Sequence, residues 1–243
     1  MIKQLAIILV SLFMISGCLK KAEEVIVPNV VPTSIPSPTP ICEPLEENFK
    51  LLLVGDSITE GTFTSSYPSE LQKLVGEDYE VLNFGVSGSS AADSAQFPYR
   101  STDVYEKSLQ QENVISIVLM FGTNDTSVNS WIDRDSFKIA YIDLVDDYLQ
   151  SYPDAKLYLC TISQAFYLEG HQEGEAEYGI QPDIVVIVNE VIHEVANEYQ
   201  LPLIDVFALT NANNPWFFDD GIHPNADGNI AIANLVYQTI TSD

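Results

Sequence analysis

The stretch FKLLLVGDSIT, residues 49–59, decides the fold class of this chain. Residues 49–54 form a short, mainly apolar run, and the turn-forming residues Gly55-Asp56-Ser57 follow it directly. A run of this length that ends in a glycine-containing turn is typical of a buried β-strand. We therefore predict that a strand occupies 49–54 and that the chain turns at Gly55.

Further segments share the length and the apolar content of this first run. They are 79–84, 114–121, 156–160 and a shorter run at 203–206. Each is bounded by turn-forming residues, which distinguishes a short buried strand from part of a longer helix. The sequence therefore predicts five strands between residue 49 and the C-terminus.

Helical patterns separate several of these strands. Apolar residues recur at intervals of three and four in 134–151, 184–199 and 232–240, and Pro182 and Pro224 stand where helix starts tolerate proline. Apolar strands that alternate with amphipathic helices indicate a parallel sheet with helices on both faces. We therefore predict an α/β fold, a three-layer α/β/α sandwich around a five-stranded parallel sheet.

The N-terminal segment has the composition of a targeting signal. Lys3 precedes an apolar run over 5–15, which is too short to span a membrane and typical of a signal peptide. The tetrapeptide ISGC, residues 15–18, resembles the bacterial lipobox, in which the cysteine is lipidated after cleavage. The alternative is an ordinary signal peptide with a cysteine near its cleavage site. We predict a lipoprotein signal peptide over 1–17 and an exported protein, anchored in the membrane of the cell envelope by lipid at Cys18.

Residues 18–48 are predicted to form a tether behind the lipidated cysteine. Six prolines fall within this stretch, and proline prevents both a helix and a central strand. No internal repeat divides the remainder of the chain. We therefore predict a single folded domain over 49–243.

The chain is strongly acidic, with 35 Asp and Glu against 10 Lys and Arg and a formal net charge of −25. Residues 49–243 carry 30 of the acids and 7 of the bases, for a net charge of −23. Such a charge repels nucleic-acid phosphates and anionic lipid head groups. The hydrophobic fraction of 46% excludes disorder throughout. The composition therefore predicts an acidic globular domain that does not bind nucleic acid.

Four short loops carry the residues suited to catalysis. GDSIT (55–59), NFGVSG (83–88) and GTND (122–125) lie at the ends of the first three predicted strands, and DGIH (220–223) precedes the last helix. In parallel sheets, ligands bind beyond the carboxyl ends of the strands. Each motif alone is a weak signal, but the four in this order are specific. We expect these loops to form one site.

Ser57, His223 and a neighbouring aspartate are the residue types that nucleophilic catalysis requires. A serine hydroxyl becomes a nucleophile when an imidazole takes its proton, and the imidazole needs a carboxylate to fix its tautomer. A spacing of three residues lets Asp220 reach one ring nitrogen of His223 while the other nitrogen faces Ser57. The adjacent Asp219 is the alternative on spacing alone.

Together, the four loops resemble the SGNH (GDSL) ester hydrolase family over essentially the whole of 49–243. The resemblance implies a flavodoxin-like fold and selects Asp220 as the orienting carboxylate. It also implies an oxyanion hole formed by the backbone N–H groups of Ser57 and Gly88 and the side-chain amide of Asn124. Glycine suits position 88 because a side chain there would crowd the reacting carbonyl.

Motifs around these loops bear on the identity of the substrate. PYR (98–100), Trp131, LPLID (201–205) and FFDDGIHPN (217–225) resemble a bacterial branch often described as sialate or carbohydrate O-acetylesterases. The predicted function is therefore a serine ester hydrolase that removes small acyl groups, foremost O-acetyl, from a small-molecule or glycan ester. The alternatives are a lysophospholipase-type or thioesterase-type acyl hydrolase with the same triad, and a glycan-binding lipoprotein without catalysis.

Several aromatic side chains and one arginine are candidates for a sugar subsite. We expect Tyr99, Arg100 and Trp131 to line it, joined by Trp216 and Phe217, because aromatic faces stack on sugar rings. The alternative is that Trp131 and Trp216 pack beneath loops.

Other polar residues are expected to have structural roles. Asp125 is predicted to brace its loop, and Cys160 to be a buried thiol, with pairing to Cys42 left open. Glu173, Glu175 and Glu177 indicate a solvated acidic loop rather than a calcium site. No metal and no cofactor are predicted, because amide donors are expected to stabilise the oxyanion. The sequence makes no prediction of the oligomeric state.

Overall fold

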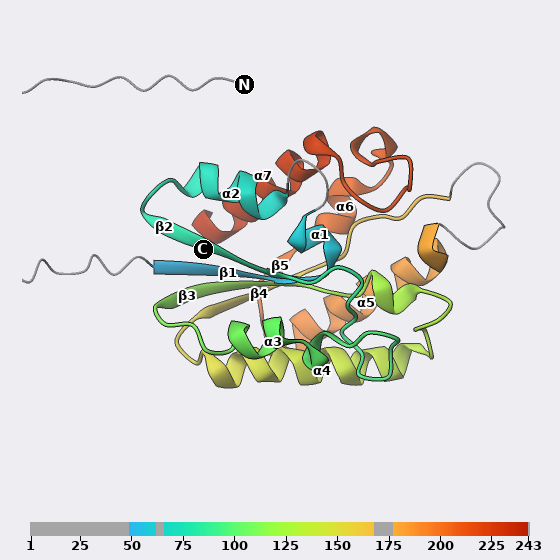
Figure 1. The fold of residues 1–243 in the computed structure, drawn as a ribbon, viewed down its shortest axis with the longest axis horizontal. Coiled ribbons are helices and arrows are strands. Elements are labelled where there is room, and N and C mark those ends of the chain that lie inside the picture. The colour runs from blue at the N-terminus through green and yellow to red at the C-terminus, as the bar shows by residue number, and fades with distance from the viewer. Residues whose placement is uncertain (1–48, 62–65, 168–176, 243) are drawn as a thin grey trace, which may run out of the picture. The chain divides into compact units, whose positions relative to one another are not determined.

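A five-stranded parallel sheet lies at the centre of the computed structural model, which describes residues 49–61, 66–167 and 177–242 (Figure 1). The strands are β1 (Phe49–Gly55), β2 (Tyr79–Gly85), β3 (Val114–Met120), β4 (Lys156–Cys160) and β5 (Leu203–Ile204). Their order is β2-β1-β3-β4-β5, and every neighbouring pair is parallel. This is the flavodoxin-like order, whose switch point lies between β1 and β3.

Helices cover both faces of this sheet (Figure 1). One face carries α1 (Ser57–Glu60), α2 (Tyr67–Val75), α6 (Val206–Thr210) and α7 (Ala226–Ser242), with α2 and α6 packed against α7. The other face carries α3 (Asp103–Ser108), α4 (Arg134–Ser151) and α5 (Pro182–Tyr199), with α4 packed against α5. The loops contain 3₁₀ turns at Tyr99–Ser101, Asn124–Thr126, Glu177–Gly179 and Asn214–Trp216. The predicted three-layer sandwich is confirmed.

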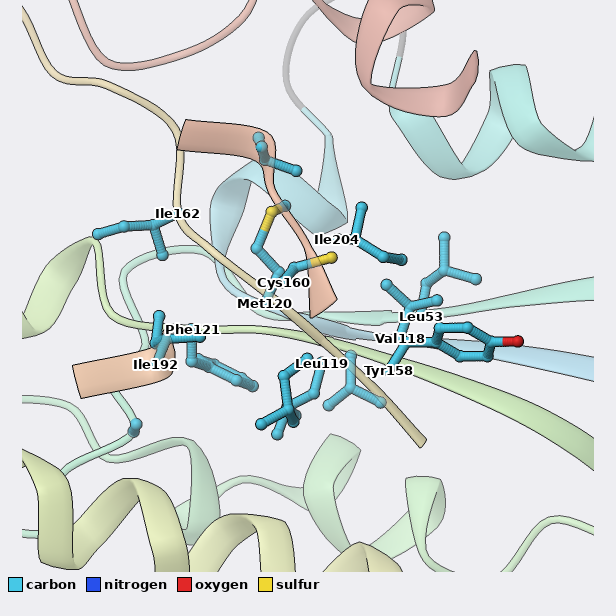
Figure 2. Packing of buried hydrophobic residues seen from close by; sticks show 14 of the residues in the cluster. Leu53, Val118, Leu119, Met120, Phe121, Tyr158, Cys160, Ile162, Ile192 and Ile204 are labelled. Atoms are coloured by element: carbon cyan, nitrogen blue, oxygen red, sulfur yellow. The ribbon is translucent and has the colours of Figure 1, made fainter. Parts of the chain in front are cut away.

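The apolar core lies between the central strands and the two helical layers. Residues 51–54 of β1 and 117–120 of β3 are almost fully buried, as expected for parallel strands covered on both faces. Figure 2 shows side chains from β1, β3, β4 and β5 gathered around one part of this core. Cys160 belongs to this cluster as a buried free thiol, and burial raises its pKa above the ordinary value.

Local sequence signals set the starts of the two long C-terminal helices. α5 begins with Pro182, in the first helical position, where a backbone N–H has no partner within the helix. α7 begins at Ala226, two residues beyond Pro224. Here the side chain of Asn225 accepts N–H groups of the first turn, so Asn225 rather than the proline marks the helix start.

The structure corrects the predicted strand at 203–206. β5 contains only Leu203 and Ile204, and Val206 already belongs to α6. The cause is Asp205, whose side chain accepts the N–H of Ala208 at 3.0 Å and thereby starts the helix. The helices α2, α3 and α6 were not predicted, because they are shorter than the window in which a helical period is recognisable.

Some predictions concern residues outside the described part of the chain. These are the signal peptide, Cys18, the tether with Cys42, and the acidic residues Glu173 and Glu175. Among the residues that the structure describes, no helix combines the length and the apolar character needed to cross a bilayer.

Candidate active site

Four loops meet at the carboxyl edge of the sheet. Ser57 is the first residue of α1, directly after β1, while Gly88 and Asn124 lie in the loops after β2 and β3. Asp220 and His223 lie in the turn before α7. All five residues line one pocket of about 480 Å³. The structure therefore brings together the five residues that the sequence selected for the reaction centre.

A continuous chain of hydrogen-bonding atoms runs from Ser57 to Asp220. Ser57 Oγ lies 2.9 Å from Nε2 of His223, and Nδ1 of the same ring lies 2.7 Å from Oδ2 of Asp220. This geometry allows the imidazole to take a proton from the hydroxyl while the carboxylate fixes the ring. Asp220, and not Asp219, is the hydrogen-bond partner of the ring.

The turn that contains Asp220 also holds its carboxylate in place. Oδ1 of Asp220 accepts the backbone N–H groups of Ile222 and His223, each at 2.9 Å. Burial opposes the charged form, but the hydrogen bonds from the His223 ring and from these two N–H groups prevail. They hold the pKa of Asp220 below its usual value, so the residue is ionised at neutral pH.

Gly88 and Asn124 line the same pocket as Ser57 and are the residues expected to supply further N–H donors. Gly88 has a φ of +78°, a conformation that favours glycine, and a Cβ there would meet no protein atom closer than Phe97 Cδ1 at 4.0 Å. Backbone conformation, rather than crowding by protein atoms, therefore requires glycine. Asn124 donates one side-chain N–H to the carbonyl of Ser89 at 2.9 Å, which leaves its second N–H for a ligand.

Asp125 ties the loop after β3 to the loop after β2. Its two carboxylate oxygens accept the N–H groups of Ala91 at 3.0 Å and Ala92 at 2.8 Å. The Asp125 side chain is buried, so these bonds are shielded from water. The prediction that Asp125 braces its loop is confirmed, and the loop it braces also carries Gly88.

Two further braces join α1 to the end of β2, and sequence reasoning missed both. Glu60 accepts the backbone N–H of Ser87 at 2.8 Å and also bonds the Ser87 hydroxyl. The side chain of Asn83 donates to the carbonyls of Thr59 and Glu60 and accepts the N–H of Gly85. Both braces connect segments more than twenty residues apart, so no local pattern announces them.

Two carboxyl groups are buried close to the nucleophile. Asp56 is 1% exposed, and its Oδ1 accepts the N–H of Ile58 at 2.9 Å, which starts α1. Burial raises the pKa of Asp56 to about 6 and the pKa of Asp125 to about 6, because hydrogen bonds replace only part of the lost hydration. The fold therefore destabilises the charged form of each of these two groups, whereas the hydrogen bonds to Asp220 stabilise its charged form.

The structure corrects the predicted sugar subsite at Tyr99 and Arg100. The Tyr99 side chain is fully buried, donates to the carbonyl of Phe84 at 2.9 Å, and packs on Phe121 with ring centroids 4.7 Å apart. Arg100 forms an ion pair with Asp147 at 2.6 Å. Neither residue lines the pocket of Ser57. The loop turns both side chains toward the protein, where core packing and charge pairing hold them.

Trp131 also lies outside the pocket. Its ring packs on Phe137, with centroids 6.5 Å apart, which agrees with the alternative that it supports a loop. Phe217 is buried against Phe166, and neither it nor Trp216 lines the pocket of Ser57. The position of a tryptophan or phenylalanine near a functional motif therefore did not predict that its side chain lines the pocket.

Among the residues that the structure describes, Phe97 and Tyr178 are the phenylalanine and tyrosine side chains that line the pocket. Phe97 is 41% exposed and Tyr178 is 68% exposed. Sequence reasoning missed both, since neither lies within a recognised motif. Large aromatic side chains left in solvent are the signal that identifies them, and only the tertiary structure provides it.

The described residues offer no group of three or more His, Cys, Asp and Glu side chains placed to hold a metal ion. The independence of the reaction from metal stays a prediction.

The fold and the pocket together define the class of this chain, a three-layer α/β protein with a hydrogen-bonded Ser-His-Asp chain at the carboxyl edge of its parallel sheet. The chain belongs to the GDSL-like Lipase/Acylhydrolase family, whose model matches residues 53–230. That match includes every residue of the candidate reaction centre, and the resemblance found in the four loops is confirmed.

Similar proteins include esterases that act on carbohydrates. An acetylxylan esterase of Xylanibacter ruminicola is 29% identical over 222 residues, which cover 81% of this chain and 44% of that protein. The chain thus spans less than half the length of this relative. A carbohydrate acetylesterase from Sinorhizobium meliloti has a TM-score of 0.67 at 16% identity, covering 80% of this chain and 99% of that one. An aryl esterase of M. smegmatis has a TM-score of 0.67 at 19% identity, with the same coverage, so the fold is shared.

Proposed function

We propose that this protein removes small acyl groups, foremost acetyl, from carbohydrates, with Ser57 as the nucleophile. The observation that carries this proposal is the hydrogen-bonded chain from Ser57 through His223 to Asp220, set in the wall of a pocket. The acetylxylan esterase relative and the carbohydrate acetylesterase of the same fold support the choice of substrate class.

In the proposed reaction, Ser57 Oγ attacks the ester carbonyl as His223 Nε2 takes the hydroxyl proton. Asp220 keeps the other ring proton on Nδ1 and stabilises the imidazolium that forms. His223 then gives its proton to the departing sugar oxygen, which leaves the acyl group on Ser57. A water molecule, activated by His223, attacks this acyl ester and releases the acid.

The oxyanion of each tetrahedral intermediate is assigned to three donors. These are the backbone N–H groups of Ser57 and Gly88 and the side-chain N–H of Asn124 that Ser89 does not engage. Donors fixed before the reaction stabilise the developing charge without further reorganisation. No metal is required in this scheme, and we expect exhaustive EDTA dialysis to leave the activity intact.

The substitution Ser57→Ala tests the proposal most directly. We expect the turnover of p-nitrophenyl acetate to fall by several orders of magnitude, because Ser57 is the hydroxyl that lies against His223 Nε2. The melting temperature should stay close to that of the wild type, since Ser57 lies at a loop end. Substantial turnover by a contamination-free Ser57→Ala preparation would overturn the assignment.

The choice among substrate classes needs a second measurement. A series of p-nitrophenyl esters from acetate to long-chain acyl groups, together with acetylated xylo-oligosaccharides, separates a sugar deacetylase from a lipase-like or thioesterase-like hydrolase. Highest kcat/KM on short acyl chains supports the proposal. A preference for long chains favours the lysophospholipase-type alternative, and binding without turnover favours the non-catalytic one.

We further propose that the protein is exported and anchored in the cell envelope by lipid at Cys18. The support is the ISGC sequence after an apolar run and the proline-rich stretch that follows. Replacing Cys18 with serine should release the protein from the membrane fraction. Unchanged membrane association of this variant, with a free thiol on Cys18 in the wild type, would contradict the proposal.

A further inference from the structure

Phe97 and Tyr178 border opposite parts of the reaction centre. The Phe97 ring lies next to Gly88, on the side of the oxyanion donors. The Tyr178 ring meets the His223 ring edge-to-face, with centroids 6.1 Å apart and an interplanar angle of 73°. Both rings line the same pocket as Ser57, so a substrate bound there lies within reach of both.

Tyr178 is held in its exposed position at a conformational cost. Its φ of 57° and ψ of 18° lie in the left-handed region, which non-glycine residues rarely adopt. Hydrogen bonds from the neighbouring loop secure this geometry: the Ser127 hydroxyl donates to the Tyr178 carbonyl at 3.2 Å, and the Val128 N–H donates to the Gly179 carbonyl at 2.9 Å. Backbone strain that the surroundings maintain is characteristic of ligand-contacting positions.

The rest of the pocket wall is polar and carries few ionisable groups. Ser87, Gln96, Asn129 and Ser130 supply hydroxyl and amide groups, which both donate to and accept from sugar hydroxyls. Apart from Tyr178 itself, the ionisable residues among the described residues that line the pocket are Asp220 and His223, and none is lysine or arginine. A carboxylate on the substrate would thus find no cationic partner here.

The surroundings of Tyr178 add negative charge. On its other side lies a second hollow that Tyr178 and Asp220 share with the first, and that Glu177 and Asp219 also line. Arg100, the cation once expected near the substrate, pairs instead with Asp147. An anionic sugar in the first pocket would therefore lie close to the carboxylates of this second hollow and meet no lysine or arginine among the described residues that line either one.

We propose that Phe97 and Tyr178 determine specificity by holding the ring of a neutral acylated sugar, while anionic acylated sugars are discriminated against. The inference rests on the proposed function and goes beyond it, because it names the residues that select the sugar and the charge of the sugar they accept. Aromatic faces pack on the C–H faces of a sugar, and the amides and hydroxyls between them bond its hydroxyl groups.

The readout is the ratio of kcat/KM for an acetylated xylo-oligosaccharide to kcat/KM for p-nitrophenyl acetate. Phe97→Ala and Tyr178→Ala should each lower this ratio about 10-fold, the effect of losing about 1.4 kcal/mol of binding energy. Tyr178→Phe keeps the ring and should restore most of the ratio. Phe49→Ala is the matched control, since Phe49 is 50% exposed at the start of β1, at the opposite end of the sheet.

Two further measurements sharpen the test. In the Ser57→Ala background, adding Phe97→Ala should weaken the binding of the acetylated oligosaccharide about 10-fold by calorimetry, which reports binding without turnover. The wild type should also hydrolyse the neutral oligosaccharide with a higher kcat/KM than an O-acetylated sialic acid.

The inference is overturned if both alanine variants keep the wild-type ratio, or if the anionic sugar is the better substrate. Absence of turnover of both substrates by the wild-type protein would instead contradict the proposed function, so the two failures are distinguishable.

Discussion

The two sides of the candidate reaction centre are built in different ways. Asp220 and His223 lie three residues apart on one turn, and within the described part of the chain the hydrogen bonds to the Asp220 side chain come from that turn. Ser57, Gly88 and Asn124 come from three separate loops. Side chains distant in sequence hold these loops together, foremost Asp125 and Glu60. We refer to the first as the base side, and to the second as the oxyanion side.

This difference predicts how substitutions on each side affect activity and stability. On the base side, a substitution changes the chemistry of the His223–Asp220 pair but leaves the surrounding turn formed. On the oxyanion side, removing one brace frees a whole loop, so donor positions and stability are lost together. The pKa values of carboxyl groups on the two sides also shift in opposite directions: the pKa of the partly buried Asp220 is lowered, and the pKa values of the buried Asp56 and Asp125 are raised.

The largest effect is expected from Asp220→Asn on the base side. The asparagine oxygen can still accept the N–H groups of Ile222 and His223, so the turn should form. Its NH₂ group would face Nδ1 of His223 and favour the wrong tautomer, which lowers kcat about 10⁴-fold in comparable triads. We expect this loss on p-nitrophenyl acetate with a melting temperature near that of the wild type. A loss below 10-fold would mean that Asp220 does not orient the base.

On the oxyanion side, Asp125→Asn should lower both the stability and the activity of the protein. One of the two buried N–H groups of Ala91 and Ala92 would face an NH₂ group and lose its acceptor, at a cost of about 1–3 kcal/mol in the free energy of unfolding. The displaced loop should lower kcat about 10-fold to 100-fold, because small misplacements of reacting groups are costly. Urea unfolding and steady-state kinetics measure the two effects. Loss of activity without loss of stability would contradict the comparison.

The opposite pKa shifts predict opposite pH dependences of stability. Folding raises the pKa values of Asp56 and Asp125 from 3.8 to about 6. The stabilisation that these two groups add to the free energy of unfolding is therefore complete below pH about 4 and is lost as the pH rises through about 6. Asp220 contributes in the other direction: its stabilisation is present above its ordinary pKa and is lost as the pH falls.

Asp56→Asn isolates one of these contributions. The asparagine cannot ionise and keeps an oxygen for the N–H of Ile58, so the fall in stability between pH 4 and pH 7 should become shallower. At pH 7.5 the variant should be more stable than the wild type by about 1–3 kcal/mol, because a buried charge is removed. Thermal melts of both proteins from pH 4 to pH 8 test this, and parallel curves would show that Asp56 does not titrate on folding.

The smallest effect is expected from salt, which acts on neither side specifically. The net charge of −23 on residues 49–243 makes the compact state repel itself, and the screening length falls from about 8 Å at physiological salt to about 3 Å at 1 M. Relief of about 1 kcal/mol raises the melting temperature by about 2–4 °C for a domain of this size. Activity on a neutral acetate ester should not change, and sucrose controls for preferential exclusion. A flat or falling melting temperature in NaCl would show that self-repulsion does not limit stability.

The different construction of the base side and the oxyanion side also explains which parts of the site the sequence could predict. The base side lies within one short motif, DGIH, so its spacing is visible in the chain and the structure confirms its geometry. Gly88 and Asn124 were found through the resemblance of their loops to a family. Their braces were only partly found: Asp125 was expected, whereas Glu60 and Asn83 bond residues more than twenty positions away and leave no local trace.

The sugar subsite shows where sequence reasoning fails. Tyr99, Arg100 and Trp131 have the right residue types near the right motifs, yet the structure points them toward the protein. Residue type alone does not tell whether an aromatic side chain packs inside or faces a pocket. Phe97 and Tyr178 were missed for the same reason.

The sequence by itself determined the strands β1 to β4, the long helices, the parallel sheet and the four loops of the candidate site. These features follow from apolar periodicity and from short motifs, which depend on neighbours in the chain. Tertiary structure alone decided which side chains line the pocket, which carboxyl groups are buried and which braces hold the oxyanion side. Exposure, burial and long-range hydrogen bonds arise from the packing of segments distant in sequence, so no pattern within one segment contains them.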